Sequence, residues 1–232
     1  MHDEASRSLR ARELAPPPSW LPPRVRFPHL RIAGVLGGVA SGKSTAARVL
    51  EEAGCLRLDA DALARARLDT GEVRSALLAR FGPQVLDACG QVDRAALAQL
   101  AFAAPSARRE LEELIHPEVR RQMLAALEEE EGRSLASGTP RWVVLDVPLL
   151  VESGWIHLCD HVLFLETPAA LRDARARADR GWNAGEVARR EAAQVPLEVK
   201  RRLAERIFAN EDVAALREQL LAWLRDARER RD

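Results

Sequence analysis

Residues 37–44 read Gly-Gly-Val-Ala-Ser-Gly-Lys-Ser, which matches the pattern G-x-x-x-x-G-K-[ST]. Glycine at positions 37 and 42 allows backbone angles and close approaches that a Cβ would block. Successive backbone N–H groups of such a loop form a concave nest for phosphate oxygens, and the positive end of a following helix strengthens that nest. The stretch therefore predicts a phosphate-binding loop (P-loop) that holds a nucleotide.

Two side chains of this loop have defined tasks in phosphate chemistry. Lys43 can reach the β- and γ-phosphates, and the Ser44 hydroxyl can ligate Mg²⁺. Lysine occurs only at positions 43 and 200 among 35 basic residues, so a compact ammonium stands where a phosphate needs one. We therefore expect ATP and Mg²⁺ as cofactors. The residues expected to hold them are Gly38, Val39, Ala40, Ser41, Gly42, Lys43, Ser44 and Thr45.

Strands and helices are expected to alternate around the loop. Ile32–Leu36 is a short apolar run typical of a buried strand. Helical periodicity follows over Lys43–Ala53 and ends at Gly54. Further buried strands are expected at 56–58, 142–145 and 161–165. The alternation predicts an α/β fold of the P-loop NTPase type, in which helices flank a parallel sheet.

The rest of the chain has a helical character. Residues 62–130 are rich in alanine, leucine, arginine and glutamate, and we expect them to form helices. Thr167 and Pro168 are a good start for another helix, with threonine as the N-cap and proline in the first position. We expect the remainder to be helical as well, with interruptions at Gly181 and Pro196.

The composition limits the classes of partner. Acidic and basic residues number 35 each, so the formal net charge is zero and no global field favours nucleic acid or an anionic membrane. The three cysteines fit neither a disulfide framework nor a zinc site, and no apolar stretch approaches the roughly 18 residues of a membrane span. We expect a cytoplasmic protein with no nucleic-acid or membrane partner. Residues 1–29, rich in proline and arginine, are expected to form a disordered arm before a single domain at 30–228; docking of Trp20 on that domain is the alternative.

A P-loop leaves open what happens to the phosphate. A guanine-nucleotide switch is expected to carry an N-K-x-D motif, and neither lysine lies in one. A hydrolytic motor usually places a water-polarising glutamate after the acidic end of its second strand, whereas Asp146 is followed by Val147 and Pro148. Asp146 can still assist Mg²⁺. Transfer to a bound acceptor therefore fits these residues better than hydrolysis does.

Such transfer needs a carboxylate near the acceptor hydroxyl and mobile arginines over the phosphates. Asp59 and Asp61 follow a predicted strand, at the edge where open α/β sheets bind ligands; N-capping of a helix is the alternative for this pair. The helix after Pro168 carries Arg172, Arg175, Arg177 and Arg180. As a group they suit a phosphate-clamping lid, with Arg175 and Arg180 as the candidate catalytic residues. For each one alone, a solvated helix face is the alternative.

Five stretches, in this order, resemble the dephospho-CoA kinase family, which carries out the last step of coenzyme A biosynthesis. They are GGVASGKST at 37–45, LDADALAR at 58–65, the pair His116–Pro117, VPLLVESG at 147–154 and AAQVPLEVKR at 192–201. Many ATPases share the P-loop, whereas the second and fourth stretches are much more specific. The resemblance extends over about residues 30–224.

The resemblance implies a kinase with three parts. These are a nucleotide-binding core, a helical acceptor-binding lobe at about 60–125 and a helical lid at about 168–200. The implied reaction is ATP-dependent phosphorylation of the ribose 3′-hydroxyl of a small-molecule substrate, dephospho-CoA, by a protein expected to be a monomer. Two alternatives stay open: another P-loop kinase of nucleotides or small molecules, and a non-catalytic nucleotide-binding module.

The resemblance also implies roles for single residues. Asp61 matches the position that receives the proton of the acceptor hydroxyl, and Asn210 matches a position near the adenine. The matches on the substrate side are Asp59, His116, Pro148, Leu149 and Glu152. For His116, a helix-capping or core histidine is the alternative.

The chain departs from the family pattern at three positions near the nucleotide. Leu36 and Ala40 replace a small hydroxyl residue and a glycine of the usual loop, and Ala209 replaces the aspartate that commonly precedes Asn210. The Cβ of Ala40 narrows the allowed backbone angles but leaves the essential glycines intact, and Ala209 bears on the contact with the adenine.

Overall fold

The computed structural model describes residues 14–230 of the chain. The chain divides into two compact units. The first contains the chain up to Leu58 and from Glu130 onward, and the second contains Asp59–Glu129.

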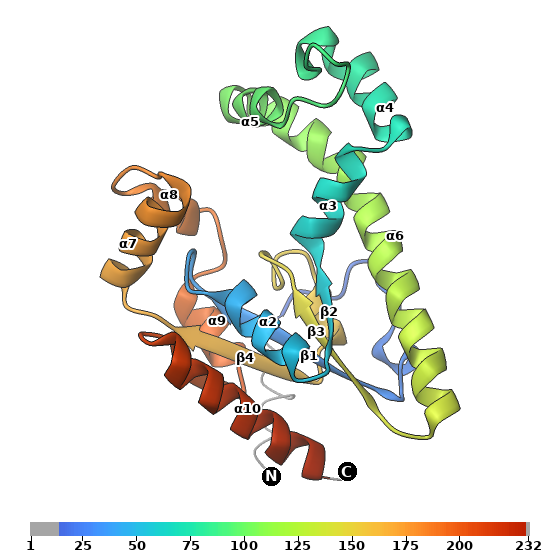
Figure 1. Ribbon diagram of the computed structural model, residues 1–232, viewed down its shortest axis with the longest axis vertical. Coiled ribbons are helices and arrows are strands. Elements are labelled where there is room, and N and C mark those ends of the chain that lie inside the picture. Colours follow the sequence, from blue (N-terminus) through green and yellow to red (C-terminus); the bar gives the residue numbers. More distant parts are fainter. Residues whose placement is uncertain (1–13, 231–232) are drawn as a thin grey trace. The chain divides into compact units, whose positions relative to one another are not determined.

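The first unit is built on a five-stranded sheet with the strand order β2-β3-β1-β4-β5 (Figure 1). The strands are β1 (Leu30–Gly37), β2 (Leu56–Asp59), β3 (Arg141–Asp146), β4 (His161–Glu166) and β5 (Arg206–Ala209). Strand β1 pairs in parallel with β3 and β4, and β4 pairs in parallel with β5. Because helices flank this sheet, the predicted α/β fold class is confirmed.

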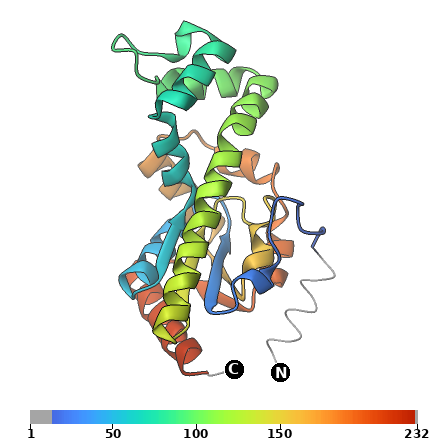
Figure 2. The ribbon, with the colours of Figure 1, turned by 90° about the vertical axis from the view of Figure 1, so that its right-hand side faces the viewer.

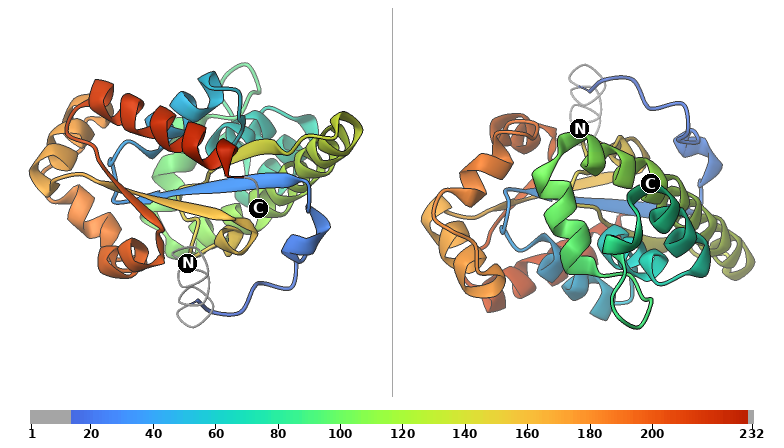
Figure 3. Two further views of the ribbon diagram at one scale, coloured as in Figure 1. Left: turned by 90° about the horizontal axis from the view of Figure 1, so that it is seen from below. Right: turned by 90° about the horizontal axis from the view of Figure 1, so that it is seen from above.

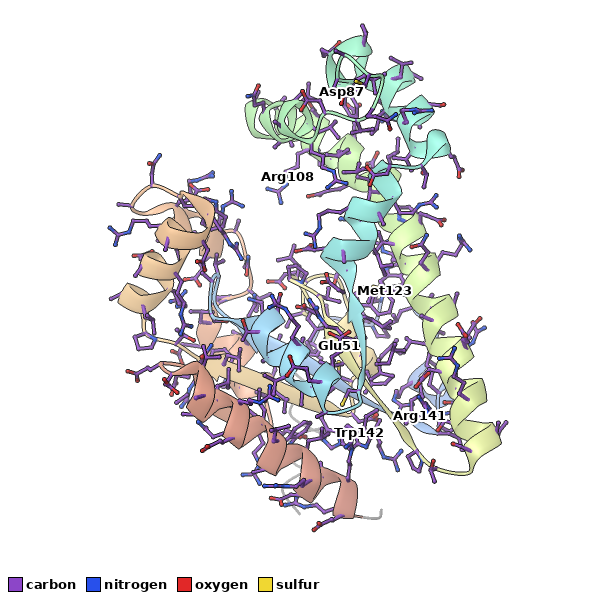
Figure 4. The ribbon with its side chains drawn as sticks, in the orientation of Figure 1. Glu51, Asp87, Arg108, Met123, Arg141 and Trp142 are labelled. Carbon is purple, nitrogen blue, oxygen red and sulfur yellow. The ribbon has the colours of Figure 1, made fainter. Side chains whose placement is uncertain are left out.

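Helices α2 (Lys43–Glu52) and α10 (Val213–Glu229) pack on one face of the sheet (Figure 3). Their apolar faces bury Leu50 and Leu220 against strand residues such as Val35. Trp142, at the start of β3 in Figure 4, meets Trp223 of α10 edge to face with 5.8 Å between ring centroids. Aromatic pairs of this geometry add to the stability that area burial gives.

The other face of the sheet is covered by the segment 147–159 and by α9 (Leu197–Leu203). The segment includes the 3₁₀ helix η3 (Trp155–Leu158). Gly34, in the middle of β1, permits this close packing because a Cβ there would lie 2.6 Å from both Leu150 Cδ2 and Cys159 Sγ. A larger residue at position 34 would therefore push the segment off the sheet.

The first two helices after β4 are α7 (Ala169–Arg180) and α8 (Glu186–Glu191), and α7 ends at Gly181, which has the left-handed conformation. The predicted cap of α7 was wrong by one position, since Pro168 is the N-cap and Ala169 begins the helix. The Thr167 hydroxyl donates instead to the carbonyl of Ser41 at 3.1 Å. A contact 126 residues away in sequence thus competes with local capping.

Strand β5 is a second difference, because the sequence pattern predicted only helices after residue 168. The strand has four residues, and only Phe208 among them is buried. A run this short shows no clear alternation, so its pairing with β4 is decided by tertiary contacts. By contrast, α2 and strands β1 to β4 lie where the pattern predicts them.

The second unit is helical, as the composition of residues 62–130 predicts. Its elements are α3 (Ala60–Leu68), α4 (Gly71–Phe81), the 3₁₀ helix η2 (Pro83–Val85), α5 (Arg94–Ala103) and α6 (Pro105–Ser137), which continues into the first unit. A small core holds it together: Val73, Leu77, Val85 and Leu97. Asp87, labelled in Figure 4, closes the turn after η2 by accepting hydrogen bonds from the amides of Cys89 and Gln91 at 2.8 and 2.9 Å. Among the described residues, no helix combines the length and hydropathy that a bilayer crossing requires.

Residues 14–29 pack within the first unit (Figure 2), which differs from the expected disorder. Phe27 is fully buried after the 3₁₀ helix η1 (Arg24–Arg26), and Leu21 is buried as well. The alternative of a docked Trp20 describes this part better, since its ring meets that of Trp155. The remainder of the predicted arm, residues 1–13, falls outside the described part of the chain.

Candidate functional site

The loop between β1 and α2 occupies the position that the motif predicts. Gly42 is the N-cap of α2 and adopts φ +91°, a left-handed conformation that favours glycine. A Cβ at Gly42 would also collide with Nδ2 of Asn210. A Cβ at Gly37 would collide in the same way with Oγ of Ser41. Both glycines of the motif are therefore required by packing as well as by backbone angles.

Ala40 carries the strain that its departure from the family pattern suggests. Its φ is +58°, and among residues 14–230 it is the one non-glycine residue with a positive φ. For an L-residue this conformation costs about 1–2 kcal/mol. The methyl group packs on a small apolar cluster of Val39, Ala176 and Val187, which joins the loop to α7 and α8. This burial offsets part of the strain.

The carbonyl of Ser41 is held by two donors from distant parts of the chain. Thr167 Oγ1 donates at 3.1 Å from the end of β4, and Asn210 Nδ2 donates at 2.6 Å from the end of β5. Asn210 was predicted near a nucleotide base; in the structure it is buried and contacts the loop directly. Thr167 was predicted only as the cap of the following helix, and its contact with the loop appears only in the structure.

Lys43 directs its ammonium at the loop itself. Its Nζ donates to the carbonyls of Gly37 and Gly38 at 3.2 and 2.8 Å. The pKa of Lys43 is lowered to about 8, first by burial and next by the nearby charge of Lys200, while the carboxylate of Asp146 opposes both effects. At neutral pH Lys43 is thus still mainly a cation, next to the amides at the start of α2.

Ser44 and Asp146 form a pair of oxygen ligands beside the loop. Ser44 Oγ donates to Asp146 Oδ1 at 3.2 Å, and Arg57 Nη2 lies 2.6 Å from Asp146 Oδ2. A hydroxyl and one carboxylate suit Mg²⁺, which keeps several waters and usually takes its other ligands from substrate phosphates. No group of three or more histidine, cysteine, aspartate or glutamate side chains within residues 14–230 is placed to hold a metal. The Ser44 hydroxyl and the Asp146 carboxylate therefore fit a phosphate-bound Mg²⁺.

The four arginines of α7 differ in their surroundings. Arg172 is buried; its Nε donates to the carbonyl of Thr167 at 3.1 Å, and it pairs with Glu191. Arg177 Nε contacts the carbonyl of Asp173 on its own helix at 3.4 Å. Arg172 is thus committed to internal contacts, and Arg177 contacts its own helix.

The two candidate catalytic arginines have fewer internal contacts than Arg172. Arg175 Nη2 reaches the carbonyl of Glu211 at 3.5 Å, and its Nη1 lies within 3.8 Å of the position that a Cβ of Gly42 would occupy. Arg180 lies over the ring of Trp182, 4.8 Å from the centroid. The charge of Arg180 is also one of the causes that lower the pKa of Lys43. The positive charge of Arg180 therefore acts at Lys43, where the phosphates are predicted to bind.

Glu191 is a loop contact that the sequence did not reveal. Its Oε1 accepts a hydrogen bond from the backbone N–H of Val39 at 2.7 Å and also pairs with Arg172. This pair lies against Gly38, since a Cβ there would be 2.5 Å from both Arg172 Nη1 and Glu191 Oε1. The end of α8 is thereby fixed to the loop. Val39 and Glu191 are 152 residues apart in sequence, and no local motif predicts a contact between them.

The turn after β3 carries the predicted substrate-side residues Pro148, Leu149 and Glu152. Pro148 is exposed and Leu149 is half-buried. Glu152 Oε1 accepts from the backbone N–H of Val195 and from Nζ of Lys200, each at 2.9 Å. Lys200, only 2% exposed, thereby links this turn to α9.

The remaining predicted residues lie in the second unit. Asp59 accepts a hydrogen bond from the N–H of Ala62 at 2.8 Å and is the N-cap of α3, so the capping alternative holds for this residue. Asp61 is exposed in the first turn of α3. His116 is exposed on α6 beside Pro117, which excludes the core alternative for it.

The first unit has the fold and the loop of a P-loop kinase: a parallel α/β sheet, a glycine loop that opens α2, a buried lysine and a hydroxyl–carboxylate pair. The chain belongs to the dephospho-CoA kinase family, whose profile matches residues 31–215. The predicted resemblance is thereby confirmed, and so is the prediction of a kinase.

Comparisons with individual proteins support the same family assignment. The chain is 40% identical over 207 residues to the dephospho-CoA kinase of Anaeromyxobacter dehalogenans, covering 87% of this chain and 96% of the relative. A crystal structure from Thermus thermophilus has a TM-score of 0.69 and 36% identity, covering 86% of this chain and 98% of that one. The dephospho-CoA kinase of Campylobacter jejuni, at 22% identity, shares the fold with a TM-score of 0.62 over 87% of this chain and 99% of its own.

Proposed function

We propose that this protein transfers the γ-phosphoryl group of ATP to the ribose 3′-hydroxyl of dephospho-CoA, giving coenzyme A and ADP. The observation that carries the proposal is the built P-loop, with Lys43 and Ser44 in place, in a chain of the dephospho-CoA kinase family. In this reaction the 3′-oxygen forms a bond to the γ-phosphorus as the bond to the β–γ bridging oxygen breaks, and the hydroxyl proton leaves.

The loop supplies charge and positioning. The amides of residues 38–45 would bind the triphosphate oxygens, and Lys43 would turn from the carbonyls of Gly37 and Gly38 to the β- and γ-phosphates. Thr167 and Asn210 support this by fixing the carbonyl of Ser41. We also assign Asn210 to the adenine side of the site on the strength of the family resemblance.

Ser44 and Asp146 would hold Mg²⁺. When bound, this ion neutralises charge on the β- and γ-phosphates. Arg57 is paired with Asp146 and keeps its carboxylate oriented toward Ser44. Arg175 and Arg180 are assigned to the phosphates from the lid side, with Arg180 favoured because its charge acts on Lys43.

Asp61 is assigned as the acceptor of the hydroxyl proton. Its side chain is exposed in the first turn of α3, whose N-cap is Asp59. An ordinary carboxylate is a weak base, so it would orient the hydroxyl and take the proton late in the transfer. His116 and the residues 148–152 are assigned to acceptor binding.

The domain assignment is also a proposal. We assign the acceptor-binding lobe to about 60–125, within the helical second unit, and the lid to about 168–200, which spans α7 and α8. A single domain at 30–228, acting as a monomer in the cytoplasm, completes the proposal.

The test is ADP release over a panel of acceptors. Purified protein with ATP and Mg²⁺ is given dephospho-CoA, a nucleoside monophosphate or no acceptor, and Lys43→Ala serves as the inactive control. Strong stimulation by dephospho-CoA alone supports the proposal. Stimulation by the nucleoside monophosphate instead would identify another kinase, and ATP binding without any turnover would identify a non-catalytic module.

A further inference from the structure

Residues 14–29 precede the part of the chain that the family profile matches, 31–215, yet they make specific contacts. The Trp20 ring meets the Trp155 ring with 5.0 Å between centroids and an interplanar angle of 61°. Pro18 lies against Gly154, where a Cβ would be 2.5 Å from Pro18 Cδ. Both contacts fall on the residues that follow the turn 147–152.

The same segment is fixed at its other end by an ion pair. Arg24 Nη2 lies 2.6 Å from Asp160 Oδ2, and its Nε donates to Oδ1 at 3.0 Å, which is a bidentate arrangement. Asp160 Oδ2 also accepts the backbone N–H of Ile32 in β1 at 2.8 Å. Phe27, which lies between Arg24 and β1 in sequence, is fully buried. The segment is therefore tied to the sheet as well as to η3.

The turn 147–152 is hydrogen bonded to the residues that follow it, which Pro18 and Trp20 touch. The N–H of Ser153 donates to Leu149 and that of Ile156 donates to Leu150, at 2.8 and 3.1 Å, so a shift at Trp155 moves the turn as a whole. Glu152, inside this turn, forms an ion pair with Lys200. The charge of Lys200 in turn lowers the pKa of Lys43. Contacts thus connect Trp20 through Trp155 and the turn to Lys200.

We propose that residues 14–29 are a brace for the turn 147–157, and that Trp20 is a positioning residue that acts through Trp155 on Glu152. The brace rests on the proposed function, in which this turn contributes to binding of the acceptor. Its action should be seen in the KM for dephospho-CoA rather than in the KM for ATP.

The test compares three full-length variants: Trp20→Ala, Trp20→Phe and Ser19→Ala. Ser19 is exposed in the same segment and serves as the matched control. Trp20→Ala should raise the KM for dephospho-CoA about fivefold, in the range that loss of an aromatic pair allows. The KM for ATP should change less than about twofold, and Trp20→Phe should restore most of the loss. All values are measured well below the unfolding temperature of each variant, so that a lower stability alone moves none of them.

Hydrogen exchange gives a readout that needs no acceptor. Trp20→Ala should speed exchange of the amides of Ser153, Gly154, Ile156 and His157, which are hydrogen bonded in the turn and η3, and leave those of β4 unchanged. The proposal is overturned if these amides keep their protection in Trp20→Ala. It is also overturned if they lose protection while the KM of Trp20→Ala for dephospho-CoA equals that of Ser19→Ala. If the parent protein does not use dephospho-CoA, the proposed function fails, and the exchange result alone decides whether the brace exists.

Discussion

Replacing Lys200 with methionine tests the contact between the turn after β3 and α9. The Lys200 side chain is 2% exposed, and its Nζ lies 2.9 Å from Glu152 Oε1, with Gln194 Oε1 as a further acceptor at 2.9 Å. Removing one partner of a buried ion pair typically costs about 3–5 kcal/mol, since the other charge is left uncompensated. Glu152 is 19% exposed and keeps the N–H of Val195. The expected loss in free energy of unfolding is therefore at the lower end, about 3 kcal/mol.

The assay is urea unfolding followed by tryptophan fluorescence for the parent, Lys200→Met, Glu152→Gln and the double variant. The double variant should be more stable than the sum of the single changes predicts, by about 1.5–3 kcal/mol, because it leaves no unpaired charge. Lys200→Arg is the control that keeps the charge but not the compact geometry. A loss below about 0.5 kcal/mol for Lys200→Met, or strictly additive changes, would refute this account of the pair.

Three further results are expected. Ala40→Gly should change the free energy of unfolding by less than about 1 kcal/mol, as relief of the φ +58° strain offsets the lost methyl contact, whereas Ala40→Val should cost about 2 kcal/mol or more in urea unfolding; equal stability of the two would contradict the strain. Asp61→Asn should lower kcat about 100-fold while the KM for ATP changes little, and a collapse of the circular dichroism signal would show a structural role instead. Burial raises the pKa of the Cys55 thiol to about 11, so iodoacetamide at pH 8 should modify the exposed Cys89 first, with Cys55 reacting only as the pH approaches 11; rapid labelling of Cys55 at pH 8 would show that it is not buried.

The parts of the fold that were predictable are those whose signal is local. The apolar run of β1, the glycine loop and the helical periodicity of α2 lie next to one another in sequence, and each predicts its own conformation. Strand β5 exists because Phe208 and its neighbours pair with β4, which no short-range pattern reveals. The same applies to Thr167, whose hydroxyl serves a distant carbonyl rather than its own helix.

The candidate site divides in the same way. The loop residues and Ser44 were predicted from the P-loop motif, because each position of that motif has a known task in phosphate binding. Glu191 touches the loop from α8, and Trp20 touches the turn from outside the family region. These contacts join residues that are more than 100 positions apart in sequence. They become visible only when the chain is folded.

Transfer of label from ATP marked in its γ-phosphate is the most direct measurement of the proposed chemistry. With dephospho-CoA and Mg²⁺, the label should appear in coenzyme A as a phosphate removable by a 3′-nucleotidase, and Lys43→Ala should yield none. Label found only in inorganic phosphate, or consumption of ATP with dephospho-CoA left unchanged, would contradict transfer to the ribose hydroxyl.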